Sequence, residues 1–260
     1  MSSREANTDC ILPDAWLTRT LGIPSFAVSG SLPADHEAFA YLLEKVSQRQ
    51  RAFFFAKVPA TDLPRLAFLE AAGFGVIDTQ VTLEHRGEPL DTLARMEVRT
   101  GGVADRTAVA DIAGTCFRYS RFHQDPEIDR NAANAIKRQW AQNCIDGLRG
   151  SEVLVAIFGG SPAGFLAVRV AEEEAKVVAT IDLVGVAVSM QGKGIGSALV
   201  QTFISRWRSR AHILRVGTQI ANSSSLRLYQ RCGFWFHDAA YVLHSHRSDR
   251  GMPATRSPRG

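Results

Sequence analysis

Two patterns of apolar and polar positions alternate along the chain and together predict an α/β fold. Short runs rich in β-branched and aromatic residues predict strands, and longer stretches with an apolar residue every three or four positions predict helices. The longest strand-like run, VVATIDLVGVAV, occupies residues 177–188. A helical pattern follows directly, with its apolar face running from Ala198 to Trp207. This strand, loop and helix are the centre of the predicted fold.

The order of these patterns predicts two α/β units. A polar, proline-containing stretch separates them, so units are expected at 13–92 and 96–246, with disorder at 1–12 and 247–260. The first unit is expected to have strands at 25–28, 53–58 and 74–83 and helices at 34–46 and 62–72. The second is expected to have strands at 96–99, 153–158, 162–170, 177–188, 213–218 and 234–244, and helices at 104–116, 128–148, 223–232 and after the central loop.

The two units match each other without gaps at an offset of 160 residues. Gly73-Phe74 then falls on Gly233-Phe234, with an aspartate five residues beyond each glycine. Any two strand–helix–strand units share apolar positions, but the common Gly-Phe and aspartate favour an internal repeat. The first unit has no glycine-rich loop and has Leu69 opposite Tyr229. It is therefore expected to be a truncated, degenerate copy that does not catalyse.

The loop between the central strand and its helix has the composition of an anion site. The three glycines of QGKGIG, residues 191–196, permit positive φ and allow the backbone to approach a ligand closely. At a helix start, unpaired N–H groups and the helix dipole favour a phosphate. The glycine spacing does not fit a Rossmann pattern, and Lys193 is followed by glycine instead of the Ser or Thr of a Walker loop. The loop is expected to bind a pyrophosphate, although a plain strand-to-helix turn could use the same glycines.

The spacing Q-x-x-G-x-G after a strand resembles the acetyl-CoA loop of the GNAT superfamily of N-acetyltransferases. A second stretch, Asn222-x-x-x-Leu226-x-x-Tyr229-x-x-x-Gly233-Phe234, is similar to a later signature of that family. The resemblance covers about residues 96–244 and implies a mixed, splayed sheet with acetyl-CoA between its fourth and fifth strands. It also implies direct attack by an amine on the thioester, without an acyl-enzyme. The cofactor-binding residues that it implies are Val186, Ala187, Val188, Gln191, Gly192, Lys193, Gly194, Ile195, Gly196, Ser197 and Asn222.

The same resemblance points to Tyr229 and Asp182 as the catalytic side chains. Tyr229 would donate to the departing sulfur, and because a tyrosine pKa of about 10 exceeds a thiol pKa of about 8.5, strong hydrogen bonding with late proton transfer is expected. Backbone N–H groups at 186–188 would polarise the carbonyl. Asp182 would act as a base through water, or else is a solvated aspartate at a strand edge. His123 and His237 are further candidates for the base.

Three further segments resemble the dTDP-fucosamine acetyltransferase group of this family: YSRFHQDP at 119–126, RQW at 138–140 and LRVGTQIANSSSLRLYQRCGF at 214–234. This resemblance implies acetylation of a nucleotide-linked amino deoxysugar for surface polysaccharides. Arg121, His123 and Gln219 would face that substrate, and Arg121 offers bidentate geometry for its pyrophosphate, with a merely solubilising surface role as the alternative. Two other functions stay open: acetylation of another small amine (amino acid, polyamine or aminoglycoside) and a non-catalytic acetyl-CoA sensor.

Composition narrows the expected partners and location. The formal net charge is +4, and four arginines and one aspartate at 247–260 supply +3 of it, so no nucleic-acid partner is expected. The cysteines lie far apart in sequence, which suggests neither a metal site nor a disulfide framework: Cys10, Cys116, Cys144 and Cys232. No apolar run reaches membrane-spanning length, and the N-terminus lacks the apolar region of a signal peptide. A cytoplasmic enzyme for a small molecule is expected, and the sequence leaves a homodimer open.

Overall fold

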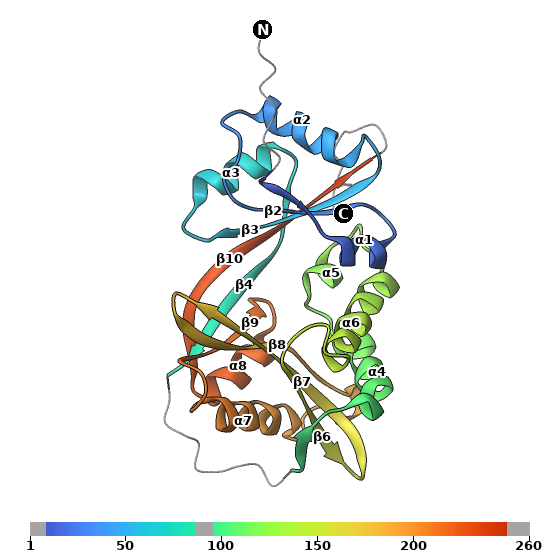
Figure 1. Cartoon of the computed structure of the whole chain (residues 1–260), viewed down its shortest axis with the longest axis vertical. Helices are drawn as coiled ribbons and strands as arrows, with labels where there is room; N and C mark the ends of the chain where they lie inside the picture. Colours follow the sequence, from blue (N-terminus) through green and yellow to red (C-terminus); the bar gives the residue numbers. More distant parts are fainter. Residues whose placement is uncertain (1–8, 87–95, 249–260) are drawn as a thin grey trace. The chain divides into compact units, whose positions relative to one another are not determined.

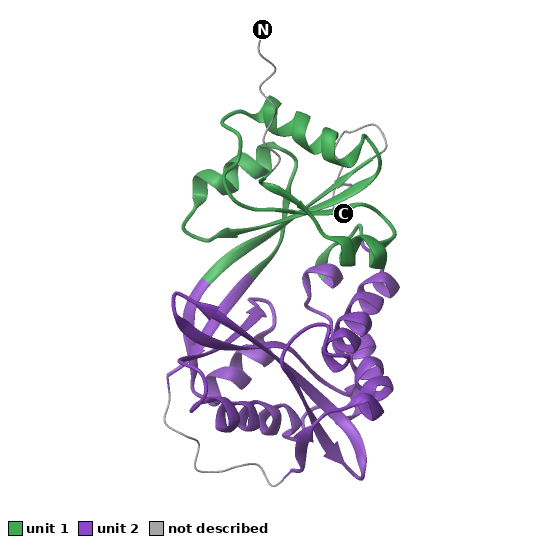
Figure 2. Ribbon diagram, viewed as in Figure 1, with its two compact units in different colours: residues 1–79, 124–127, 239–260 green, residues 80–123, 128–238 purple. Residues whose placement is uncertain are grey.

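The computed structural model describes residues 9–86 and 96–248. Figure 2 shows the division of the chain into two compact units. Unit 1 takes its described residues from 1–79, 124–127 and 239–260, and unit 2 takes them from 80–123 and 128–238. The units are interleaved because strands β4 (Gly75–His85) and β10 (Phe234–Arg247) each supply residues to both. The sequence pattern predicts continuous units at 13–92 and 96–246 instead.

Unit 1 is a small sheet with helices, and its strand order is β1-β2-β3-β10. Its core forms where the apolar faces of two helices meet the sheet: Phe39, Leu42 and Leu43 of α2 and Leu69 of α3 pack with Phe54 and Val58. Figure 1 labels its elements. Besides parts of β4 and β10, they are β1 (Ile11–Pro13), α1 (Ala15–Leu21), β2 (Ser25–Val28), α2 (His36–Ser47), β3 (Ala52–Pro59) and α3 (Leu63–Ala71).

Both ends of unit 1 are more ordered than the sequence pattern predicts. Residues 11–13 form β1, which pairs antiparallel with β2 and buries Ile11 opposite Val28. Helix α1 follows, with Asp14 accepting a hydrogen bond from the Leu17 amide at its start. Arg247 belongs to β10 and donates to the Ala72 carbonyl oxygen at 2.7 Å. The rest of the predicted disorder, at 1–8 and 249–260, lies outside the described residues.

Unit 2 is a larger mixed sheet with the strand order β4-β9-β8-β7-β6-β5. Strands β8 and β9 run parallel, and the pairs β4–β9, β7–β8, β6–β7 and β5–β6 run antiparallel. The strands are β5 (Val98–Thr100), β6 (Glu152–Phe158), β7 (Ser161–Glu173), β8 (Lys176–Val186) and β9 (Ile213–Gln219). The helices are α4 (Arg106–Cys116), α5 (Arg121–Gln124), α6 (Arg130–Ile145), α7 (Ile195–Trp207) and α8 (Ser223–Arg231), with short 3-10 turns at Val103–Asp105 and Val188–Met190.

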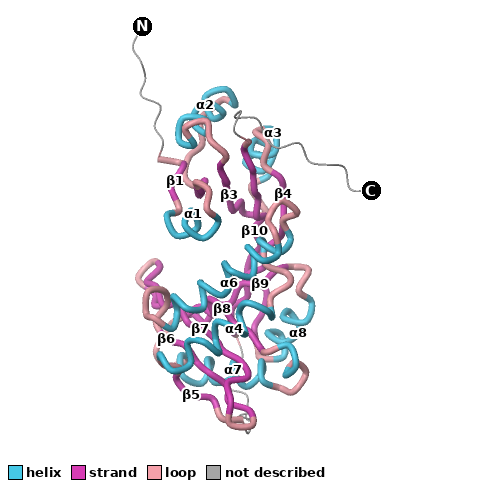
Figure 3. The backbone as a smooth tube through the Cα atoms, turned by 90° about the vertical axis from the view of Figure 1, so that its right-hand side faces the viewer, coloured by secondary structure: helices cyan, strands magenta, loops and turns pink. Residues whose placement is uncertain are grey.

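Helices cover both faces of this sheet, as Figures 1 and 3 show. Leu199 and Phe203 of α7 join Tyr229 of α8 in a core with one set of strand side chains. Val109 and Ala141, from α4 and α6, form a second core with the set on the opposite face. The expected α/β class with a mixed open sheet and flanking helices is confirmed. No helix among residues 9–86 and 96–248 is long and apolar enough to cross a membrane.

The sheet of unit 2 opens between β8 and β9. These strands pair from Val178 opposite Ile213 to Ile181 opposite Val216, and β8 then continues to Val186 without further recorded pairs to β9. The register between β7 and β8 shifts at the same level, so that Asp182 is an extra residue in a β-bulge. The strand predicted at 177–188 is β8, and it ends at Val186, two residues earlier than predicted. The separation of β8 and β9 creates the space in which the candidate site lies.

The element positions support the internal repeat. Helix α3 shifted by 160 residues coincides with α8, and the left-handed glycines Gly73 and Gly233 end both. The same offset converts the β4–β9 pair Gln80–Gln219 into the β10–β3 pair Ala240–Pro59. The last strand of the first half, β4, therefore pairs with β9 of the second half, and the last strand of the second half, β10, pairs with β3 of the first. This exchange explains why the units are interleaved along the chain.

Candidate active site

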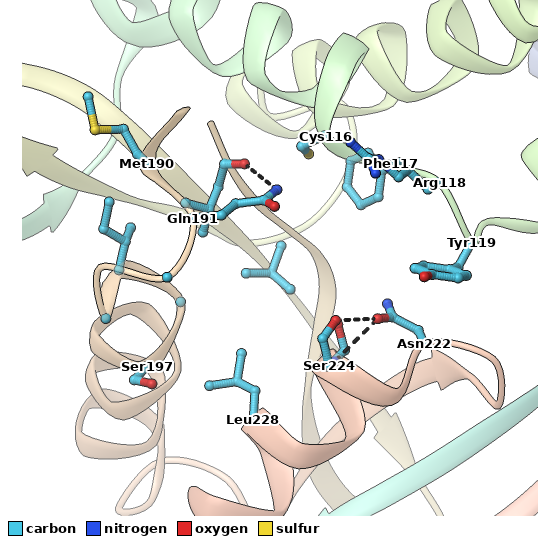
Figure 4. Close-up of a pocket in the computed structure, with 18 of the residues that line it drawn as sticks. Cys116, Phe117, Arg118, Tyr119, Met190, Gln191, Ser197, Asn222, Ser224 and Leu228 are labelled. Atoms are coloured by element: carbon cyan, nitrogen blue, oxygen red, sulfur yellow. Dashed lines mark hydrogen bonds between the residues drawn. The ribbon is translucent and has the colours of Figure 1, made fainter. Parts of the chain in front are cut away.

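A pocket of about 660 Å³ lies in unit 2 where β8 and β9 separate. Figure 4 shows its walls: the segment after α4, the loop before α7 and the start of α8. Its lining comprises Cys116, Phe117, Arg118, Tyr119, Ser120, Val184, Gly185, Val186, Met190, Gln191, Gly192, Gly194, Ile195, Gly196, Ser197, Gln219, Asn222, Ser224, Ser225, Leu228 and Arg231.

The glycine-rich loop forms one wall through its backbone. Gly192 and Gly194 have φ angles of 79° and 81°, in the left-handed region that side chains disfavour. Gly194 also caps α7, with no side-chain hydrogen bond to the helix start. The first amides of α7 therefore have no intrahelical acceptor and border the pocket from Ile195 to Ser197. A helix N-terminus of this kind offers unpaired donors and a positive dipole end, which favour an anion.

Most of the predicted cofactor residues line this pocket, as does Gln219 from the predicted substrate set. They are Val186, Gln191, Gly192, Gly194, Ile195, Gly196, Ser197 and Asn222. Ala187, Val188 and Lys193 do not line it. The Ala187 amide donates to the Ala163 carbonyl oxygen at 2.9 Å, and the Lys193 ammonium contacts the Met190 sulfur at 3.4 Å and lies over the Phe158 ring.

The opposite wall is formed by Cys116–Ser120, just before the residues predicted to meet the acceptor. Arg121 and His123 do not line the pocket. His123 contacts Asn134 Oδ1 through Nε2 at 2.9 Å; since that oxygen only accepts, Nδ1 accepts from the Ser120 hydroxyl at 2.6 Å. Burial lowers the pKa of His123, so the ring is neutral at pH 7. His123 therefore orients Ser120, which does line the pocket.

Sequence reasoning missed the lining residues Arg118, Tyr119 and Ser120. The signal was available, because the motif that drew attention to residues 121 and 123 begins at Tyr119. The short helix α5 starts at Arg121 and directs the following residues elsewhere: the Arg121 guanidinium lies over the Phe122 ring, 4.5 Å from its centroid. The residues that line the pocket end at Ser120, where α5 begins, and this boundary is visible only in the structure.

Tyr229 lies behind the α8 wall. Its side chain is buried in the unit 2 core and meets the Phe234 ring edge-on, with centroids 6.0 Å apart. Burial raises the pKa of its hydroxyl, so the group stays protonated at neutral pH. Leu228, not Tyr229, borders the pocket. Donation by Tyr229 to a sulfur stays a prediction.

Asp182 is held by partners on the α6 side of the sheet. Its carboxylate accepts from Trp140 Nε1 at 2.8 Å and from Arg149 Nε at 2.9 Å. Burial by itself would raise the pKa of Asp182, but the hydrogen bonds and charge of Arg149 lower it below its ordinary value. Asp182 does not line the pocket, so these contacts favour a structural ion pair over a base or a solvated edge residue. His237, another candidate base, contacts Glu84 at 3.4 Å and is also absent from the lining.

A buried lysine stands behind the acceptor wall and carries no sequence signal of its own. Lys137 lies on α6 over the rings of Phe117 and Trp140, with its ammonium 4.9 and 4.5 Å from their centroids. Burial lowers its pKa to about 8. Burial also raises the pKa of the neighbouring Cys116 to about 12, so this pocket thiol is not ionised at neutral pH. A thiolate nucleophile at Cys116 is therefore disfavoured.

Comparison with known proteins agrees with this geometry. The chain matches the model of the acetyltransferase (GNAT) family over residues 107–234, which contain the loop, the separated strands and α8. Enzymes of this family use acetyl-CoA. A GCN5-related N-acetyltransferase from Sphaerobacter thermophilus has the same fold, with a TM-score of 0.59 at 14% identity over 92% of this chain and 77% of that one.

Two named relatives extend the match into the first half of the chain. The spore coat polysaccharide biosynthesis protein SpsD of Bacillus subtilis is 32% identical over 83% of this chain and 73% of its own length. The dTDP-fucosamine acetyltransferase of Escherichia coli is 26% identical over 73% of this chain and 80% of its own length. By the family model that it matches and by its sequence relatives, the chain belongs to the GNAT family of acetyltransferases and is an acyltransferase.

Proposed function

We propose that this enzyme transfers an acetyl group from acetyl-CoA to the amine of a nucleotide-linked amino deoxysugar, by direct attack in a ternary complex. The observation that carries the acceptor class is the match to a dTDP-fucosamine acetyltransferase over 73% of the chain, well beyond the family loop. The relative named for spore coat polysaccharide biosynthesis supports the same class. Acetylation of another small amine is the competing outcome of the test below.

The donor would bind along the loop wall. The first amides of α7 would hold the pyrophosphate, since the helix start offers unpaired donors and a positive dipole end. Lys193 is directed to Met190 and Phe158, so backbone groups instead of this ammonium would supply the contact. The pantetheine arm and thioester would then extend between the ends of β8 and β9, beside Val186 and Asn222.

The acceptor would bind against the opposite wall. Arg118 is the cation that lines the pocket there, and its guanidinium suits bidentate contact with a diphosphate. This assigns to Arg118 the role that sequence reasoning gave to Arg121. Ser120, whose hydroxyl donates to His123, would accept a hydrogen bond from the sugar. Binding energy from the remote diphosphate would then position the amine at the thioester carbon.

In the chemical step the amine nitrogen bonds to the thioester carbon, the C–S bond breaks, and the amine loses a proton while the sulfur gains one. Two phenols are candidates for the donor to sulfur. Tyr229 is protonated and buried behind Leu228, whereas Tyr119 lines the pocket, as Figure 4 shows. Asp182 is less suited to take the amine proton because Arg149 and Trp140 occupy its carboxylate. Water in the open pocket would take that proton.

The test is release of CoA thiol with paired acceptors, a dTDP-linked 4-amino sugar and the same free amino sugar. We expect kcat/KM to be several orders of magnitude higher for the linked form, because the free sugar lacks the diphosphate. Arg118→Ala should lower kcat/KM by about 100-fold for the linked sugar only, and Arg210→Ala, outside the pocket lining, should leave both unchanged. Equal turnover of linked and free sugars would favour the small-amine alternative.

A further inference from the structure

Three metal-ligating side chains converge in unit 1, outside the acetyltransferase pocket. Asp125 comes from the short segment 124–127, and His244 and His246 come from β10. Their ligand atoms all lie within 4.8 Å of one another. Asp125 and His244 are buried, and the side chain of His246 is 11% exposed. The residues stand 119 and 121 positions apart in sequence, which is why no local motif indicates them.

Both imidazoles point at the same carboxylate oxygen. His244 Nδ1 lies 2.6 Å from Asp125 Oδ2, and His246 Nε2 lies 2.8 Å from the same atom. Residues two apart on a strand project to the same face, so β10 presents the two rings side by side. One carboxylate oxygen and two ring nitrogens therefore lie close enough together to bind one ion.

The cluster is held by a rigid scaffold. Strand β10 pairs with β3 across this stretch, placing His244 opposite Phe55 and His246 opposite Phe53. The Phe53 ring packs against both imidazoles, with centroid separations of 4.7 and 5.1 Å. The other carboxylate oxygen, Asp125 Oδ1, accepts from the Glu127 amide at 3.0 Å. Such outer contacts fix the orientation of metal ligands in proteins.

A small cavity borders the cluster and offers space for a further ligand. Its volume is about 210 Å³, and its lining includes all three side chains together with Glu127 and the turn at Gly73–Gly75. Every residue of this lining belongs to unit 1. A water molecule or the Glu127 carboxylate could complete the coordination of an ion held by the other three. The cavity is separate from the acetyl-CoA pocket, because the two linings share no residue.

We propose that Asp125, His244 and His246 form a site for a divalent transition-metal ion, with Zn²⁺ as the representative ion. Two imidazole nitrogens and one carboxylate oxygen are a donor set for Zn²⁺ or Fe²⁺, and they do not suit the all-oxygen preference of Mg²⁺ or Ca²⁺. A tetrahedral ion with bonds of about 2.1 Å holds its donors about 3.4 Å apart. Binding therefore requires the two present hydrogen-bond distances to open by about 0.7 Å.

The metal would act as a structural clamp. It would fix residues 124–127 to β10, and this segment begins at the last residue of α5. The competing explanation is a hydrogen-bonded His–Asp–His network that never takes up an ion. The two differ in metal content and in spectroscopy, neither of which depends on the acceptor or on acetyl transfer.

The experiment uses the full chain produced without a histidine tag, stripped with a chelator and titrated with Zn²⁺ in competition with a chromophoric chelator. We expect one Zn²⁺ per chain and, with Co²⁺ instead, visible absorption typical of a four-coordinate site. His246→Gln and Asp125→Asn should each weaken Zn²⁺ binding by about 100-fold or more. Loss of a group that only supports a metal ligand already costs about 10–100-fold in metal affinity, and these residues would be the ligands themselves. His36→Gln, on the exposed face of α2 in the same unit, is the matched control and should bind as the wild type does.

Circular dichroism shows whether each variant is folded. If both cluster variants fail to fold, the Co²⁺ spectrum and the zinc-dependent rise in melting temperature of the wild type decide the question. Absence of stoichiometric Zn²⁺ binding and of the Co²⁺ bands in the wild type would overturn the proposal in favour of the hydrogen-bonded network. Unchanged affinity in a folded His246→Gln would also overturn it.

Discussion

Replacing Gly194 by valine tests whether the start of α7 holds the diphosphate of acetyl-CoA. Gly194 has a φ of 81°, and a Cβ built there meets no protein atom within 4 Å. The protein would therefore accommodate the side chain without a clash and would bear only backbone strain. For a residue with a Cβ, that strain is about 1–2 kcal/mol, and β-branching adds to it.

The expected effect on the cofactor follows from the hydrogen bonds at stake. The amides of Ile195, Gly196 and Ser197 border the pocket beside Gly194, and each bond to a charged phosphate is worth about 1.5–3 kcal/mol. Valine would keep the phosphate from the backbone and shift the loop toward negative φ. Loss of a single such bond, about 2 kcal/mol, raises the Kd for acetyl-CoA by about 30-fold.

Calorimetric titration with acetyl-CoA measures this change, and thermal unfolding measures the strain. Gly22→Val is the matched control: its φ is 71°, its Cβ also meets nothing within 4 Å, and it lies at the end of α1 in unit 1. Both variants should lose similar stability, and only Gly194→Val should lose affinity. A folded Gly194→Val protein with wild-type affinity would show that the diphosphate binds elsewhere.

The remaining predictions concern the two candidate catalytic side chains and the exchanged strands. Tyr229→Phe should lower kcat by about 100-fold with an unchanged Kd for acetyl-CoA, and a wild-type kcat would refute the donor role. Asp182→Asn should cost about 2 kcal/mol of stability in urea unfolding at pH 7 while kcat stays within a few-fold, and a large fall in kcat would restore the base hypothesis. Because the folded pKa of Asp182 lies below 3.8, its contribution is present above about pH 4 and disappears as the pH falls through the folded pKa, so the difference from Asn should vanish in strong acid. The fragment 96–247 lacks the residues of β4 that pair with β9, so it should lack a cooperative unfolding transition, whereas the fragment 80–247 should regain one. Cooperative unfolding of 96–247 would show that β4 is not needed to stabilise β9.

Local signals explain what the sequence could predict. Strand β2 has the predicted bounds 25–28, and α8 begins one residue after Asn222, whose side chain accepts from the Ser225 amide as a cap. The glycine loop was predictable because left-handed φ angles at Gly192 and Gly194 require glycine. Each of these features is decided by residues within one or two turns of chain. The repeat was predictable for the same reason, since both copies carry the same local signals.

Long-range register decides what the sequence could not predict. The bulge at Asp182 arises from the pairing of β8 with β7 and turns this side chain toward Trp140 and Arg149. Its apolar neighbours in sequence gave no sign of an arginine 33 residues away. The cluster of Asp125 with two histidines likewise depends on a contact across more than 100 residues. Periodicity identifies strands and helices, but it carries no information about such partners.

The first half of the chain has no glycine-rich loop, but its strand β4 stabilises the sheet of unit 2. Residues 80–84 of β4 pair with β9, and Val81 and Leu83 are buried in the unit 2 core. Each such side chain is worth about 1.5–3 kcal/mol, so the two together contribute about 3–6 kcal/mol, which reaches the lower end of the net stability of a domain, about 5–15 kcal/mol. Strand β9 ends at Gln219 in the pocket wall and leads into α8. The first half therefore stabilises a strand that borders the pocket, although it contributes no residue to the pocket lining.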